Sequence, residues 1–131
     1  MRIPSAIFTI LSLALLLTAC ARTLPVYNVT EAPVVTGSGT TPSLNQVEDA
    51  IVKACRDKEW FADPVADGHI VAKVRVRKHT AVVDILYSPT NYSITYKDSE
   101  MLLYDGTLIH RNYNKWVQLL ADRIDQELNS L

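Results

Sequence analysis

The stretch HIVAKVRVRKHTAVVDILY, residues 69–87, alternates apolar and polar side chains on both sides of a short central segment. A period of two residues is typical of β-strands that bury one face. We predict a β-hairpin that turns at Lys78 and His79, with Arg77 paired with Thr80. A slip of one residue would mix apolar and polar side chains on both faces, which favours this register. The apolar face then carries Ile70, Ala72, Val74, Val76, Ala81, Val83, Ile85 and Tyr87.

A third strand follows in YSITYK, residues 92–97, after the turn-forming residues 88–91. Its side chains Tyr92, Ile94 and Tyr96 continue the apolar face of the hairpin. We therefore predict a three-stranded antiparallel meander. The residues just before the hairpin contain an Asp-Pro and an Asp-Gly pair, which indicate a turn.

Two amphipathic helices are predicted, one on each side of the meander in the sequence. The first begins at Ser43, because Ser43 and Gln46 have the spacing of a capping box, and it runs to about residue 59. The second begins between Leu108 and Asn112 and continues to the end of the chain, since apolar residues recur there at steps of three and four. The predicted fold class is α+β in the order α-β-β-β-α, with both helices packed on one face of the meander.

The N-terminus has the features of a secretory signal peptide. A short basic start precedes an apolar run, residues 6–17, that is shorter than the roughly 20 residues needed to cross a bilayer. The run ends in LTAC, residues 17–20, which resembles the lipobox of bacterial lipoproteins. The resemblance implies that residues 1–19 are removed as a lipoprotein signal peptide. It also implies that Cys20 carries a diacylglycerol and an N-acyl chain, with no other cofactor expected. An ordinary signal peptide with a chance cysteine is the alternative.

The residue after Cys20 is Ala21, whereas lipoproteins retained at the inner membrane tend to have Asp there. The resemblance therefore implies lipid anchoring at the outer membrane, with the protein facing the periplasm. Residues 20–42 are rich in Thr, Pro and Gly, and we predict that they form the acylated cysteine and a flexible linker. As a coil, such a linker spans about 25 Å. The α+β globular domain then occupies residues 43–131.

The balance of charge argues against a nucleic-acid partner. The chain has 13 Lys and Arg against 14 Asp and Glu, whereas a nucleic-acid-binding domain is expected to be strongly basic. His69, His79 and His110 show no metal-binding spacing, so no metal site is predicted. No catalytic motif such as G-x-S-x-G is present, and we predict that the protein is not an enzyme. Cys55 lies on the apolar stripe of the first helix and is expected to be buried and unreactive.

The C-terminal stretch YSITYKDSEMLLYDGTLIHRNYNKWVQLL, residues 92–120, resembles a family of small, uncharacterised proteobacterial lipoproteins. The shared features are Y-S-I-x-Y, a turn rich in Asp and Ser, and I-H-x-x-Y-N-x-W. They correspond here to Tyr92, Ser93, Ile94, Tyr96, Ser99, Leu102, Tyr104, Ile109, His110, Tyr113, Asn114 and Trp116. The resemblance implies a lipoprotein domain, and it brings no catalytic residues because the family has no assigned chemistry.

Polar residues at the start of the last helix form the first candidate site. His110, Asn112, Asn114 and Trp116 would make a small polar pocket that binds a ligand or a partner. In the alternative, Asn112 or a neighbour caps the helix, and His110 and Asn114 tie down residues 98–108 by hydrogen bonds. We favour this structural alternative.

A basic surface on the polar face of the meander is the second candidate site. Lys73, Arg75, Arg77 and Lys97 lie there with aliphatic side chains between them, a composition that suits contact with a partner. The partners considered are an envelope protein, peptidoglycan and a lipid headgroup. The alternative is a solvated sheet face, whose charges prevent aggregation.

Together these features predict a non-enzymatic lipoprotein of the outer membrane, whose periplasmic domain binds an envelope component through the basic sheet face. The alternative from another class is a carrier of a small ligand or lipid. A carrier requires an apolar cavity between the helices and the sheet, lined by Tyr87, Tyr92, Tyr96 and Trp116.

Overall fold

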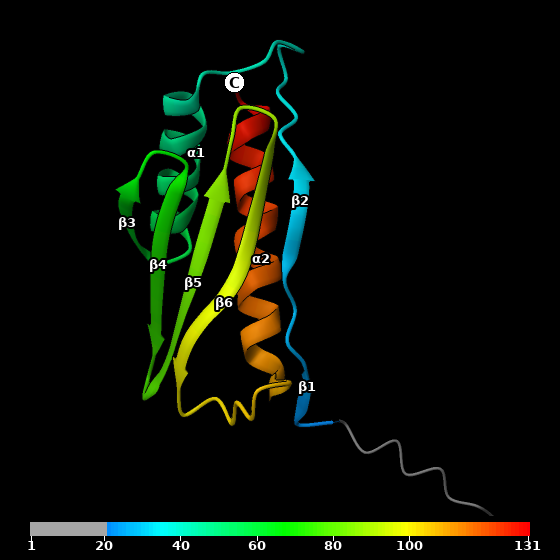
Figure 1. The fold of residues 1–131 in the computed structure, drawn as a ribbon, viewed down its shortest axis with the longest axis vertical. Helices are drawn as coiled ribbons and strands as arrows, with labels where there is room; N and C mark the ends of the chain where they lie inside the picture. Colours follow the sequence, from blue (N-terminus) through cyan, green and yellow to red (C-terminus); the bar gives the residue numbers. More distant parts are fainter. Residues whose placement is uncertain (1–20) are drawn as a thin grey trace, which may run out of the picture.

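The computed structural model describes residues 21–131; residues 1–20, with the predicted signal peptide and Cys20, lie outside the described part. The strands are β1 (Thr23–Pro25), β2 (Val29–Pro33), β3 (Phe61–Ala66), β4 (His69–Val76), β5 (His79–Tyr87), β6 (Asn91–Glu100) and β7 (Leu108–His110), and the helices are α1 (Leu44–Asp57) and α2 (Arg111–Asn129). Strands β2, β6, β5, β4 and β3 form an antiparallel sheet in that order, and β1 pairs with β7 in a separate small sheet (Figure 1).

The prediction of a three-stranded meander is wrong. Strands β4, β5 and β6 form such a meander, but β3 and β2 extend it at its two edges, and β1 and β7 add a second sheet. Of the two pairs expected to form a turn before the hairpin, Asp67 and Gly68 do form the turn between β3 and β4, whereas Asp63 and Pro64 lie in strand β3, where Pro64 is at the sheet edge next to a register shift. Edge strands and bulges tolerate proline because its missing amide hydrogen is not needed there.

The flexible linker expected before residue 43 is also wrong over strands β1 and β2. In β2, Val29 lies opposite Ile94 of β6 and is buried in the core. The partners of both strands lie far along the chain, so the composition of residues 20–42 does not reveal the pairing. The folded part of the described chain therefore already includes Thr23.

The hairpin of β4 and β5 has the predicted faces but a different register. Val76 pairs with His79, and Arg77 and Lys78 form the turn, so the predicted pairing of Arg77 with Thr80 is wrong. The register differs by an even number of residues, which leaves each side chain on the expected face. Tight hairpin turns of this length need positive φ angles, and Arg77 adopts a φ of 56°.

Both helices cover the same face of the five-stranded sheet (Figure 1). The capping box of α1 is confirmed: the Gln46 amide donates to Ser43 Oγ at 3.1 Å, and the Ser43 amide donates to Gln46 Oε1 at 2.8 Å. Helix α2 begins within the expected interval, although β7 occupies the first part of that interval. Within residues 21–131, neither helix combines the length and the apolar character needed to cross a bilayer.

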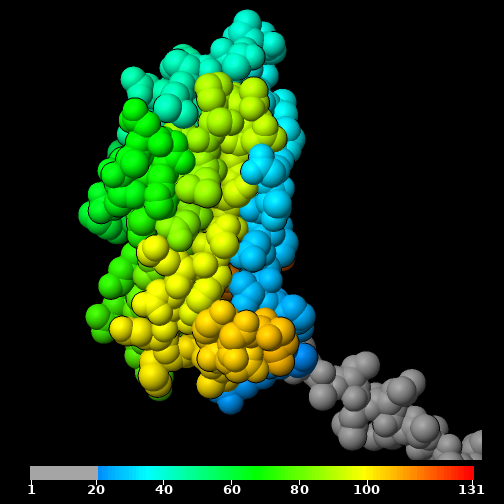
Figure 2. All heavy atoms as spheres, in the orientation of Figure 1, coloured from blue at the N-terminus to red at the C-terminus, as the bar shows by residue number. Residues whose placement is uncertain are grey.

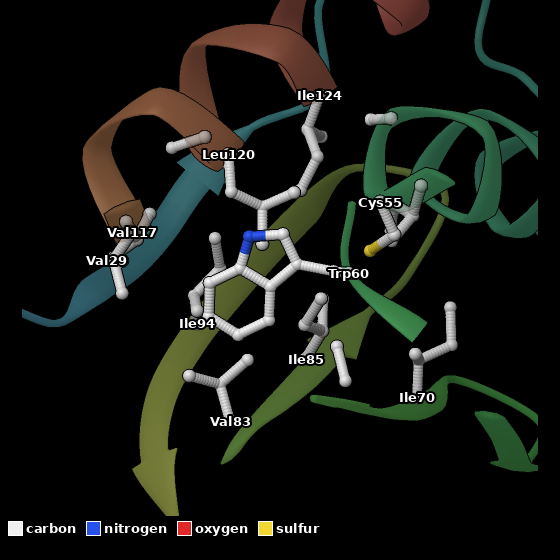
Figure 3. Packing of buried hydrophobic residues seen from close by; sticks show 14 of the residues in the cluster. Val29, Cys55, Trp60, Ile70, Val83, Ile85, Ile94, Val117, Leu120 and Ile124 are labelled. Carbon is white, nitrogen blue, oxygen red and sulfur yellow. The ribbon is translucent and has the colours of Figure 1, made fainter. Parts of the chain in front are cut away.

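Trp60 occupies the centre of the core between the helices and the sheet (Figure 3). Its indole lies among Leu120 and Ile124 of α2 and Val83 and Ile94 of the sheet, and only 4% of the residue is exposed. One of the two tryptophans of the chain thus fills the space where the two layers meet. The core depends on this one residue more than the alternation in the strands indicates.

Candidate functional site

The five-stranded sheet has one face that neither helix covers, and we call it the open face. Residues that pair in an antiparallel ladder share a face, so Phe61, Lys73 and Val82 form one row across it. Lys97 also lies there, with its Nζ atom 3.5 Å from Asp84 Oδ2. Three of the four residues of the predicted basic surface, Lys73, Arg75 and Lys97, therefore lie on the open face, since Arg75 is two residues from Lys73 on β4 and pairs with Thr80.

Carboxylates lie among the basic residues of the open face. Asp63 of β3 and Asp98 of β6 pair with outward-facing residues of the neighbouring strands, and Asp84 Oδ1 is 2.7 Å from His69 Nε2. The open face is therefore mixed in charge rather than basic. The sequence did not indicate Asp63 and Asp98 because their positions depend on strand β3 and on the bulge between β5 and β6.

Arg75 and Arg77 lie beside the β4–β5 turn. Arg75 Nε donates to the carbonyl oxygen of Arg77 at 3.1 Å, which holds the Arg75 side chain against the turn. Both residues are exposed. Arg75 therefore lies on the open face near its turn end, and of the four predicted basic residues only Arg77 lies in the turn itself.

Apolar side chains accompany the charges on the open face. Phe61 of the edge strand β3 is 72% exposed, and Leu86 of β5 is also exposed. Val71 and Val82 lie between them and are half-buried. Exposed aromatic side chains are enriched at surfaces that contact another protein, where charged residues form the rim.

The residues expected to form a polar pocket at the start of α2 do not converge. His110 is the N-cap of α2: its Nδ1 atom accepts a hydrogen bond from the Asn112 amide at 3.1 Å, while the Asn112 side chain is exposed. Trp116 instead borders a cavity of about 180 Å³ together with Trp60 and Val74. Residues two apart on a helix do not face each other, which is why the side chains diverge.

Asn114 holds the N-terminal segment against α2. Its Nδ2 atom donates to the Pro25 carbonyl at 3.0 Å, and its Oδ1 atom accepts from the Tyr27 amide at 2.9 Å. The residue is buried, and its amide group forms hydrogen bonds with the backbone rather than facing a ligand. The segment that it holds is the end of β1 and the residues directly after it, and not residues 98–108.

The tyrosines expected to line a carrier cavity connect the layers instead. Tyr87 OH donates to Glu48 Oε2 of α1 at 2.6 Å, and Tyr92 OH donates to Asp125 Oδ1 of α2 at 2.7 Å. Burial, reinforced by these carboxylates, raises the pKa of both tyrosines far above the ordinary value, so both hydroxyls remain donors. With Trp60 at the centre of the core, these contacts give the carrier alternative no support (Figure 3).

The end of the molecule at which the described chain begins carries a second surface. It consists of β1, β7, the β4–β5 turn and the loop of residues 101–107, and we call it the tether end (Figure 1). The Arg111 amide donates to the Arg22 carbonyl at 3.1 Å, and the rings of His79 and His110 are 6.5 Å apart. The hairpin, the start of α2 and the N-terminal strand therefore meet here.

The loop at the tether end exposes apolar side chains. Met101, Leu103 and Tyr104 are 59%, 52% and 42% exposed, whereas Leu102 between them is buried. Met101 and Leu103 adopt positive φ angles of 61° and 57°. A non-glycine residue in this region costs about 1–2 kcal/mol, and such strain concentrates at functional surfaces. The backbone thus holds apolar side chains in solvent at an energetic cost.

An aromatic cluster supports this loop. The ring of Tyr104 lies 4.1 Å from that of Tyr96, and the Tyr96 ring lies 5.7 Å from that of Tyr113. Among the described residues, the buried Tyr113 hydroxyl has no hydrogen-bond partner. A groove of about 620 Å³ runs between the end of β6 and the loop, and Met101 and Leu103 border it. The cluster fixes the direction in which the loop projects.

The N-cap at His110 is expected to weaken in acid. Burial lowers the pKa of His110 below its ordinary 6.5, and the nearby Arg22, Arg111 and His79 lower it further. The neutral ring can accept from the Asn112 amide, whereas the protonated ring cannot. Because the folded pKa lies below the unfolded value, this stability is present above a pH of about 6.5 and is lost as the pH falls below it.

Replacement of His110 by Asn, an efficient N-cap that does not titrate, is expected to remove this part of the pH dependence. Urea midpoints at neutral and mildly acidic pH compare the two proteins, and an NMR titration of the ring gives the pKa of His110. Equal losses of stability in the wild type and the H110N variant on acidification would show that the cap is not responsible.

Cys55 is buried in the core, and its predicted burial is confirmed. Burial raises the pKa of this thiol to about 12, which keeps it protonated and unreactive. Across residues 21–131, no three His, Cys, Asp or Glu side chains are grouped so that they could hold a metal ion. The open face and the tether end, which expose apolar side chains, are therefore the two candidate binding surfaces.

Comparisons of the chain with protein-family models, with curated proteins and with solved structures gave no match.

Proposed function

We propose that this chain is a non-enzymatic lipoprotein, anchored in the outer membrane through acylated Cys20, whose periplasmic domain binds another envelope protein through its open face. The lipobox at residues 17–20 and the resemblance of residues 92–120 to small proteobacterial lipoproteins support the anchor. The proposal of a binding surface rests on the sheet face that neither helix covers, where exposed Phe61 lies beside Lys73.

A protein partner fits the open face better than peptidoglycan or a lipid headgroup does. Carboxylates and phosphates favour a predominantly basic surface, but Asp63, Asp84 and Asp98 lie among the basic residues here. Complementary charges of both signs give specificity between proteins, and apolar side chains such as Phe61 and Leu86 add contact area. The expected partner therefore presents apolar side chains together with charges of both signs.

Replacement of Cys20 by Ser is expected to release the protein from the membrane, because stable anchoring depends on its acyl chains. Labelled palmitate supplied to growing cells reports acylation, and fractionation of the envelope reports location. The wild type should incorporate the label and sediment with outer membranes, and the variant should do neither. Equal recovery of the C20S variant in the membrane fraction would contradict an anchor at Cys20.

Photo-crosslinking from the open face tests the binding surface in cells that express the full chain. A photoreactive side chain placed at Lys73 or at Leu86 is expected to give an adduct of one defined mass. The same group at Asp122, on the exposed surface of α2, is the matched control and should not give it. Adding Phe61→Glu should reduce the adduct formed from position 86. An unchanged yield in that variant, or the same adduct from position 122, would rule out the open face.

A further inference from the structure

The covalent path from the proposed anchor to the folded chain is short. The Cα atoms of Cys20 and Thr23 can be at most about 11 Å apart, since each residue of extended chain adds about 3.6 Å. Thr23 already pairs with His110, and the Arg22 carbonyl accepts from the Arg111 amide. Anchoring at Cys20, on which this inference rests, therefore brings the tether end to the bilayer surface.

The tether end has the chemistry of a membrane contact. Met101 and Leu103 offer exposed apolar side chains, and Tyr104 combines an aromatic ring with a hydroxyl, which favours the interface between headgroups and acyl chains. Figure 2 shows the loop, in orange, as a lobe beside the blue N-terminal strand. Arg77 and Lys78 of the β4–β5 turn add exposed cations at the same end of the molecule (Figure 1).

Cations exceed acids around this loop. The exposed cations here are Arg22, Arg77, Lys78 and Lys97, against the carboxylates of Asp98, Glu100 and Asp105. The Asp105 carboxylate is turned back into the loop, where Oδ1 accepts from the amides of residues 107 and 108 at 2.9 and 2.7 Å. The hydrogen bonds from those amides favour the ionised carboxylate and therefore lower the pKa of Asp105. They also partly offset its negative charge. The excess of cations complements an anionic lipid surface.

We propose that the tether end docks on the phospholipid surface, with Met101 and Leu103 inserted at the level of the headgroups and Arg22, Arg77 and Lys78 bound to lipid phosphates. In the docked protein the exposed side chains of Met101 and Leu103, whose positive φ angles cost energy, contact lipid instead of water. The strands run along the long axis of the molecule, so docking through the tether end orients them away from the membrane surface rather than along it (Figure 1). The open face remains accessible to a protein partner.

A fluorescent label at position 103 tests docking in the full acylated chain. Leu103→Cys is labelled with NBD and reconstituted into vesicles of phosphatidylethanolamine and phosphatidylglycerol that contain a spin-labelled lipid as quencher. The buried Cys55 and the acylated Cys20 do not compete for the label. Ser38→Cys, in an exposed loop at the opposite end of the molecule, is the matched control (Figure 1). Flotation of the vesicles establishes that each protein is anchored before quenching is measured.

We expect NBD at position 103 to be quenched and NBD at position 38 to remain unquenched. Adding Arg77→Glu and Lys78→Glu should shift the docking equilibrium by about fivefold or more for each reversed charge, and should reduce quenching without changing flotation. Absence of quenching at position 103 in protein that floats would overturn docking and leave the anchor intact. Failure of the acylated protein to float would overturn the anchor, and docking with it.

Discussion

Replacement of Trp60 by Ala is expected to lower the free energy of unfolding by about 3–5 kcal/mol. The indole is almost completely buried between α2 and the sheet (Figure 3). Its removal leaves a cavity that Leu120, Ile124 and Val83 cannot close, because α2 and the sheet hold them in place. A single domain is typically stable by about 5–15 kcal/mol, so the variant would lose a large part of its stability.

Urea unfolding followed by circular dichroism measures this loss. Trp116→Ala is the matched control, because it removes the same side chain from a half-buried position that borders the same small cavity. The loss in the control is expected to be clearly smaller. Trp60→Phe should also cost less than Trp60→Ala, since much of the ring volume remains. Equal losses for the two alanine variants would contradict a central role for Trp60 in the core.

Replacement of Asn114 by Ala is expected to lower the free energy of unfolding by about 1–3 kcal/mol and to loosen β1. The Asn114 side chain satisfies the Pro25 carbonyl and the Tyr27 amide, and both groups lose a partner in the variant. Hydrogen exchange should therefore increase over residues 23–29, while the amides of β4 and β5 stay protected.

Asn112→Ala provides a close control for this experiment. Asn112 lies two residues away on the same helix, but its side chain is exposed. The control is expected to unfold at nearly the same urea concentration as the wild type and to leave exchange over residues 23–29 unchanged. If Asn112→Ala and Asn114→Ala have equal effects, the hydrogen bonds of Asn114 do not hold the N-terminal segment.

The central hairpin could be predicted because its information is local. Alternation along β4 and β5 identified the buried face, including Val83 and Ile85, and the spacing of Ser43 and Gln46 identified the start of α1. The register could not be predicted in the same way, because a shift of two residues keeps every side chain on its face. The turn decides the register, and it relies on a positive φ at Arg77, which the residue type does not indicate.

The edge strands could not be predicted because their partners define them. Strands β2 and β3 are short and contain proline, and only the hydrogen bonds to β6 and β4 make them strands. The candidate surfaces share this limit. Lys73 and Lys97 were identified as exposed cations, but the placement of Asp63 and Asp98 among them follows from the edge strand and the bulge. The tether end likewise exists only because β1 pairs with β7, a contact between distant parts of the chain.

The short pairing of β1 with β7 determines the order in which contacts break when the attachment is pulled. A pull between an acylated Cys20 and the domain first loads the hydrogen bond from the Arg111 amide to the Arg22 carbonyl, and β1 then separates from β7 one residue pair at a time, starting at Thr23. Asn114 then bears the load through its two bonds to the following segment. Once these break, Val29 of β2 is the next residue paired in a strand, and the reach from Cys20 grows from about 11 Å to about 32 Å. The attachment therefore acts as an extensible strap that lets the domain rise from the membrane under tension while its core stays folded.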